Sequence, residues 1–304
     1  MDRIMQISTF NDLMAIASQG EKALSLGDGS PKEDVPFYLY RGESKHHPFL
    51  LSHIQGYASQ KDPFKWKETI EEKERTFLDR FLAEIEPYRE LNHQYHWYCP
   101  PCPKTDTFWY LSVMQHFGCP TRLCDFTSDF WTAVFFATRR TRCATEGTDV
   151  CLYRLKCIHN DKSGNKLPKD CKGEAWSNSA GHDMNELLGY IIRYKGFPAP
   201  TEKIQERLAH FNGKGDAQMF GWDRPYWRNA RIQKQFGFFV YCVDVKTPLG
   251  DSINDSIDKY GTTFERFQIS ANIVPEIRSE LERKGLIEWK VFLDLDRAFE
   301  PWRK

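Results

Sequence analysis

One stretch organises this chain: residues 115–128, Gln-His-Phe-Gly-Cys-Pro-Thr-Arg-Leu-Cys-Asp-Phe-Thr-Ser. Before it, residues 107–117 place apolar side chains at helical spacing, and residues 130–137 do so after it. Gly118 and Pro120 end the first of these helices, because neither residue favours continuing it. The stretch is therefore predicted to be a polar turn between two buried helices.

The polar residues of this turn allow two interpretations. In the structural one, Asp125 pairs with Arg122, and Thr127 caps the following helix. In the functional one, free N–H groups at the helix start near Ser128, together with Arg41 or Arg122, hold an anion such as a pyrophosphate. A turn needs Gly and Pro, but it does not need Gln, His, Thr, Arg and Asp together, so a ligand site is favoured.

The elements around the stretch indicate an α+β fold. Helices are predicted at 64–86, 202–211 and 274–284, and strands at 35–40, 149–157, 187–194, 237–245 and 286–293. The first strand is expected to break at Arg41-Gly42, and 237–245, the most apolar strand, is expected mid-sheet. Together they predict a central mixed or antiparallel sheet with flanking helices. Residues 1–34 are assigned to an N-terminal extension, 35–296 to one domain with an inserted loop at about 158–186, and 297–304 to a tail.

Composition excludes some classes of protein. Lys and Arg number 42, as do Asp and Glu, so no net charge favours nucleic acid or an anionic membrane. No apolar run is long enough for a signal peptide or a membrane span, and the nine cysteines fit reduced thiols, so a cytoplasmic location is expected. Cys99 and Cys102 have metal-ligand spacing, but no second close pair follows, so no metal site is predicted.

Three motifs resemble the FRG domain family. Tyr40-Arg41-Gly42 is similar to the aromatic-Arg-Gly triplet that names it, and residues 115–137 resemble its most specific segment, Gln-His-aromatic-Gly-x-Pro-Thr-Arg-Leu-x-Asp-aromatic-Thr before an Ala-rich helix. Residues 231–239 are similar to its Arg-Ile-x-x-Gln-x-Gly-x-Phe motif. The resemblance spans about residues 35–296.

A more distant resemblance links the chain to ADP-ribosyltransferases. It implies that NAD is the substrate and a macromolecule the acceptor, in the manner of an intracellular toxin or defence effector. It also implies that Arg41 clamps the ribose or diphosphate, Ser128 or Thr127 orients the nicotinamide side, and Gln235 binds the 2′-hydroxyl. The predicted catalytic residues are Arg41, Ser128 and Gln235, and the predicted ligand-binding residues are Gln115, His116, Thr121, Arg122, Asp125 and Thr127.

The chain departs from the transferase pattern at Gln235, where those enzymes carry Glu. A neutral amide lacks the charge that stabilises an oxocarbenium-like centre, so another acid would have to supply it, with Glu265, Asp223 and Asp125 as candidates. The alternative hypothesis is a module that senses a nucleotide or binds a protein without turnover.

Overall fold

The structure is a computed structural model that describes residues 4–25, 37–45, 49–85, 107–139, 149–157, 220–223, 235–242, 244–260, 263–288 and 291. Its strands are β1 (Ile4–Ile7), β2 (Phe37–Glu43), β3 (Leu123–Thr127), β4 (Val150–Cys157), β5 (Phe220–Asp223), β6 (Gly237–Cys242) and β7 (Thr263–Ile269). The described helices are α1 (Phe10–Ser25), α2 (His53–Lys61), α3 (Trp66–Ile85), α4 (Thr107–His116), α5 (Phe130–Thr138), α10 (Leu249–Tyr260) and α11 (Val274–Arg283), with a 3-10 turn at Ala271–Ile273.

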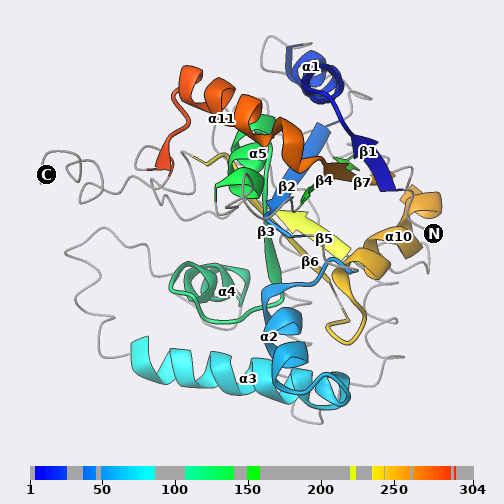
Figure 1. Ribbon diagram of the computed structural model, residues 1–304. Helices are drawn as coiled ribbons and strands as arrows, with labels where there is room; N and C mark the ends of the chain where they lie inside the picture. The colour runs from blue at the N-terminus through cyan, green and yellow to red at the C-terminus, as the bar shows by residue number, and fades with distance from the viewer. Residues whose placement is uncertain are drawn as a thin grey trace, which may run out of the picture.

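The described strands form one seven-stranded sheet in the order β1-β7-β4-β2-β3-β6-β5 (Figure 1). β1 pairs with β7 in parallel, and the other neighbouring strands are antiparallel. The prediction of an α+β fold with a mixed sheet is therefore confirmed, whereas its likeness to ADP-ribosyltransferases stays a prediction.

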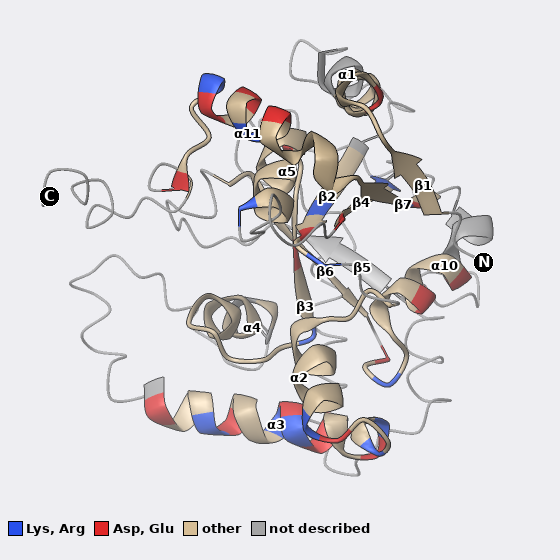
Figure 2. Cartoon of the chain, in the orientation of Figure 1, with Lys and Arg blue, Asp and Glu red and all other residues tan. Residues whose placement is uncertain are grey.

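The two faces of the sheet are covered by different helices. On one face, α1, α5 and α11 pack over β1, β7, β4 and β2, and α4 packs over β3 and β6 with α3 outside it (Figure 1). On the other face, Leu249 and Ile253 of α10 pack against alternate residues of β2, β3, β4 and β6. Figure 2 shows charged residues concentrated along the outer helices, such as α3. The core consists of these apolar clusters on both faces.

The N-terminal segment contributes to this core. Residues 4–7 pair with residues 266–269 at the edge of the sheet. Ile7 is buried with Leu13, Ile16 and Ala17 of α1 in the cluster beneath α5. Residues 1–34 were assigned to an extension, but 4–25 are part of the sheet and its covering layer.

The prediction that the first strand breaks at Arg41-Gly42 is wrong. β2 continues through both residues to Glu43, with Arg41 opposite Tyr153 and Gly42 opposite Leu152 of β4. Gly42 is needed for close packing rather than for a turn, because a Cβ atom there would lie within 2.6 Å of Ala137 N and closer still to Ala133 O. Glycine therefore lets α5 lie directly on the strand that carries Arg41.

The stretch 115–128 is also more ordered than predicted. Its second half is strand β3, which pairs with β6 from Leu123 to Thr127, so the turn ends before Leu123. Neither Thr127 nor Ser128 caps the next helix; Asp129 does, with its carboxylate accepting from Thr132 N at 2.6 Å. Alternating apolar and polar residues would have marked a strand in the sequence. This segment shows no such alternation, because Asp125 is its single exposed residue and the others are buried.

Several other predicted elements are confirmed. The helices at 64–86, 107–117 and 274–284 correspond to α3, α4 and α11, and 149–157 corresponds to β4. β6 lies one strand from the edge instead of mid-sheet, because only β5 follows it. The final strand at 286–293 is wrong where the structure describes it, since Val291 N donates to Ile287 O in a helical turn. The loop at 158–186, the strand at 187–194 and the helix at 202–211 lie outside the described residues.

Candidate functional site

The sheet opens between β2 and β3. These strands pair through Tyr40 and Thr127, whereas β2 pairs with β4 along all seven of its residues. Continuing the antiparallel register would place Arg41 opposite Phe126 and Glu43 opposite Cys124, but these residues are not paired. The strands separate there, and backbone groups at the gap are left for side chains or a ligand to satisfy.

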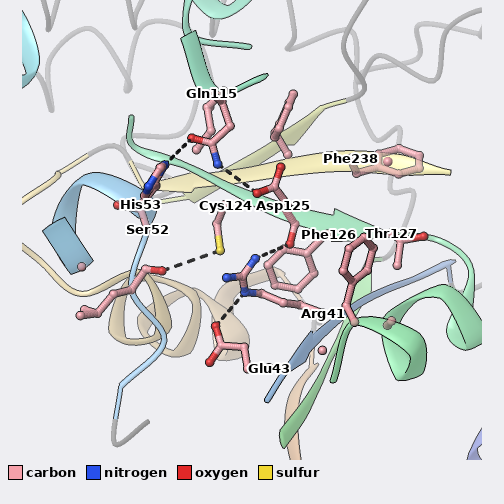
Figure 3. A pocket seen from close by; sticks show the side chains of 18 of the residues that line it. Arg41, Glu43, Ser52, His53, Gln115, Cys124, Asp125, Phe126, Thr127 and Phe238 are labelled. Carbon is pink, nitrogen blue, oxygen red and sulfur yellow. Dashed lines mark hydrogen bonds and ion pairs between the residues drawn. The ribbon is translucent and has the colours of Figure 1, made fainter. Parts of the chain in front are cut away.

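A pocket of about 1050 Å³ lies at this opening (Figure 3). We call it the β2–β3 pocket, and α2, α4, α5 and β6 complete its wall. Its lining includes Arg41, Glu43, Lys45, Phe49, His53, Tyr57, Gln115, His116, Cys124, Asp125, Phe126, Thr127, Phe136, Arg139, Gln235 and Phe238. The lining thus combines cationic, acidic, amide and aromatic side chains, which suits a ligand with both charged and ring-shaped parts.

Arg41 spans the gap between the strands. Its Nε donates to Glu43 Oε1 at 2.9 Å, and its Nη1 donates to the Asp125 carbonyl at 2.8 Å (Figure 3). Nη2 has no hydrogen-bond partner among the described residues, and a quarter of the side chain is exposed. Burial alone lowers the pKa of this guanidinium, but Cys124, Glu43 and Asp125 outweigh that effect and raise the pKa above its usual value. Arg41 therefore presents a permanent charge and a free donor to the pocket.

Gln115 links α4 and α2 to Asp125. Its Nε2 donates to Asp125 Oδ2 at 3.0 Å, and its Oε1 accepts from Thr121 Oγ1 at 2.8 Å. His53 Nδ1 lies 3.3 Å from the same Oε1. Thr121 is itself fully buried and does not line the pocket, so it acts behind Gln115. His116, also predicted, lines the pocket beside the Phe117 ring.

Thr127 and Gln235 are joined by a hydrogen bond in the pocket lining. Thr127 Oγ1 donates to the Gln235 carbonyl at 2.7 Å, while Gln235 Nε2 donates to the Val291 carbonyl at 3.2 Å. Both residues line the pocket. Ser128 lies next to them, with its N–H donating to the Phe236 carbonyl, but it is not part of the lining.

Arg122 lies away from the pocket. Its side chain is 1% exposed, and its Nε and Nη2 donate to the Glu74 carboxylate of α3 at 2.9 and 2.5 Å. The prediction that it pairs with Asp125 is wrong, because Arg122 pairs with Glu74 and the Asp125 carboxylate accepts from Gln115 instead. Arg122 ties β3 to α3 and is not positioned to bind an anion in this pocket.

Of the acids proposed to replace a glutamate at 235, Asp125 is the one that lines the pocket among the described side chains. Glu265, on β7, accepts from Arg154 Nε at 2.6 Å and does not line the pocket. The Asp223 side chain lies outside the described residues.

Sequence reasoning missed Glu43, His53 and Arg139. Glu43 comes directly after the Arg41-Gly42 pair. A strand that continues through this pair places the Glu43 side chain on the same face as that of Arg41. His53 comes from α2, which carries no signal linking it to the 115–128 stretch. Arg139 lies at the end of α5 with its guanidinium over the Phe136 ring and lines the pocket.

Among the described residues, one thiol lines the pocket, that of Cys124. Burial raises the pKa of Cys124 to about 12, against the lowering effect of Arg41, so this sulfur is no nucleophile at neutral pH. Among the described residues, no group of three or more His, Cys, Asp or Glu side chains is placed to hold a metal ion. Cys99 and Cys102 lie outside those residues. None of the described helices is long and apolar enough to cross a membrane.

Comparison with known proteins identifies a single part of the chain. The family model of the FRG domain matches residues 37–146, which extend from the start of β2 past the end of α5 and so include most of the pocket. No curated protein and no solved structure matches significantly.

Proposed function

We propose that the protein, whose residues 37–146 match the family model of the FRG domain, binds NAD in the β2–β3 pocket and transfers its ADP-ribose moiety to a macromolecule. One observation carries the proposal. The three positions that resemble the ADP-ribosyltransferase pattern, far apart in sequence, lie together: Arg41 follows Tyr40, Tyr40 pairs with Thr127, and Thr127 Oγ1 bonds to Gln235.

The charges of the pocket suit the parts of NAD. Arg41 Nη2 is open to a phosphate or ribose oxygen, and Lys45 and Arg139 add cationic groups to the lining. A phosphate oxygen suits this donor, because a hydrogen bond between two charged groups is stronger than one between neutral groups. Phe49, Phe136 and Phe238 provide ring faces for the nicotinamide or adenine.

The test is nicotinamide release from NAD by the purified full-length chain. The wild type should release nicotinamide, and Arg41→Ala should lower kcat/KM by roughly 100-fold, because a charged contact to the diphosphate is lost. Arg80→Ala, which removes an exposed arginine of α3 far from the pocket lining, is the matched control. Toxicity on expression in cells, relieved by Arg41→Ala, would support an effector enzyme.

The alternative is a module that binds NAD or another phosphate-bearing nucleotide without turnover. Gln235 favours it, since this residue is uncharged and its amide already donates to Val291 within the protein. In that case NAD should stabilise the wild type without nicotinamide release, and Gln235→Glu should introduce release by adding the missing charge.

A further inference from the structure

The proposed reaction needs a negative charge that faces the sugar. When the bond between ribose C1′ and nicotinamide breaks, positive charge develops on the ribose, and a carboxylate nearby stabilises it. Gln235 supplies none. We propose that Asp125 provides this carboxylate and that Gln115 is its positioning residue. The inference rests on the proposed function.

Two described carboxylates line the β2–β3 pocket, and their surroundings differ. Glu43 accepts from the Arg41 guanidinium at 2.9 Å, and its side chain is 15% exposed. Its charge is therefore largely offset by a permanent cation. Asp125 is exposed, and its Oδ2 is held by a neutral amide, Gln115 Nε2, at 3.0 Å. Its Oδ1 has no partner among the described residues. Asp125 thus keeps its charge available to a ligand.

The orientation of Gln115 is fixed by its neighbours. Thr121 Oγ1 accepts from Leu123 N at 3.2 Å, so its proton is free to be donated to Gln115 Oε1. That bond turns the Gln115 carbonyl oxygen toward Thr121 and leaves Nε2 facing Asp125. His53 Nδ1 shares the same oxygen and acts as a donor, because a carbonyl oxygen has only lone pairs to offer. The buried Thr121 therefore sets the direction of a carboxylate at the pocket surface.

Asp125 is also fixed relative to Arg41. The Arg41 Nη1 donates to the backbone carbonyl of Asp125 at 2.8 Å, while the side chain of Asp125 leaves β3 on the opposite side of this contact, toward α4 (Figure 3). Asp125 thus orients the Arg41 guanidinium through its backbone carbonyl, and its side-chain carboxylate stays available to a ligand. Because Arg41 and Asp125 line the same pocket, one bound dinucleotide can contact both of them.

The C1′–N bond of NAD breaks, and its electron pair stays on the nicotinamide nitrogen, which leaves as neutral nicotinamide. An acceptor hydroxyl, or water in its absence, donates an oxygen lone pair to C1′. The hydroxyl proton passes to the Asp125 carboxylate and from there to solvent. The products are the ADP-ribosylated acceptor or free ADP-ribose, nicotinamide and one proton.

The experiment compares Asp125→Asn with Glu43→Gln, each replacing a pocket carboxylate by an amide of the same shape. Asp125→Asn should lower kcat for nicotinamide release by about 100-fold while KM and the NAD-induced rise in Tm stay near wild-type values, because only the charge facing the sugar is lost. Glu43→Gln should act mainly on KM, since it loosens Arg41. Gln115→Met should lower kcat about tenfold without changing KM, as expected when a positioning contact is removed.

Two outcomes would overturn the inference, and they differ. In the first, the wild type releases nicotinamide and Asp125→Asn has a kcat within threefold of the wild-type value. Asp125 would then have no part in the step, but the NAD activity would remain. A wild type that releases none would overturn both this inference and the transferase proposal. Unfolding of the ligand-free variants should match the wild type, since Asp125 is exposed and asparagine can still accept from Gln115.

Discussion

Arg41 and Arg122 are the two arginines that the sequence motifs place in one site, and the structure separates them. Arg122 is buried, and the Glu74 carboxylate accepts from its backbone N, Nε and Nη2. Arg41 is a quarter exposed, spans the gap between β2 and β3, and leaves Nη2 without a described partner. Both lie near a carboxylate, so pairing alone does not distinguish them. Exposure and an unused donor do, and by these criteria Arg41 can bind a ligand and Arg122 holds the fold.

Arg122 should dominate the stability of this region. Arg122→Met would leave Glu74 charged and unpaired in the core, which costs about 3–5 kcal/mol of the free energy of unfolding. Denaturation with urea would measure the loss. The double variant with Glu74→Leu should recover most of it, because well-packed apolar side chains often replace a buried pair without cost. A double variant as unstable as the single one would contradict a pair that acts mainly within itself.

Gly42 should matter because it lets α5 lie on the strand that carries Arg41. Gly42→Ala forces a Cβ against the backbone of Ala133 and Ala137, and overpacking of this kind costs about 3 kcal/mol. Gly56→Ala is the matched control, since nothing lies within 4 Å of a Cβ there and alanine favours the α2 helix. Urea denaturation of both variants tests this; equal stability would mean that α5 does not lie so close to β2.

Removing Arg41 should affect stability far less than removing Arg122. Its partner Glu43 can reach solvent, so Arg41→Ala is expected to cost about 1 kcal/mol or less in urea denaturation. A loss as large as that of Arg122→Met would show that Arg41 is a structural residue, and the distinction between the two arginines would fail.

The pocket thiol should show the smallest effect. Because burial raises the pKa of Cys124 to about 12, its thiolate forms only as pH rises toward that value. Iodoacetamide should leave Cys124 unmodified in the native protein at pH 7.5, as checked by peptide mass mapping, and unfolding in urea should expose it. Rapid labelling of the native protein would mean that the pocket is more open at β3 than described.

The sequence was informative where side-chain periodicity and packing agree. It predicted α3, α4, α11 and β4, and the mixed α+β sheet. It failed at Gly42, because a glycine that lets a helix approach looks the same in sequence as one that makes a turn. It also failed at β3, where a five-residue strand follows a Gly-Pro turn with no clear alternation.

The residues of the candidate site were also predicted only in part. Arg41, Gln115, His116, Asp125, Thr127 and Gln235 were predicted site residues and line one pocket. Thr121 and Arg122 were predicted too, but they are buried just before β3 and do not line the pocket, and burial of single residues cannot be read from a segment assigned to a turn. Glu43 and His53 were missed because β2 was ended too early and α2 is joined to the site only in three dimensions.

The central claim is that Arg41, unlike Arg122, binds the ligand, and the NAD-induced change in Tm tests it most directly. At NAD concentrations about 100-fold above Kd, binding adds about 2.7 kcal/mol, so the Tm of the wild type and of the Arg80→Ala control should rise by roughly 5 °C. Arg41→Ala should unfold near the wild-type temperature without NAD and lose most of the rise. No rise in the wild type, or an unchanged rise in Arg41→Ala, would contradict the account.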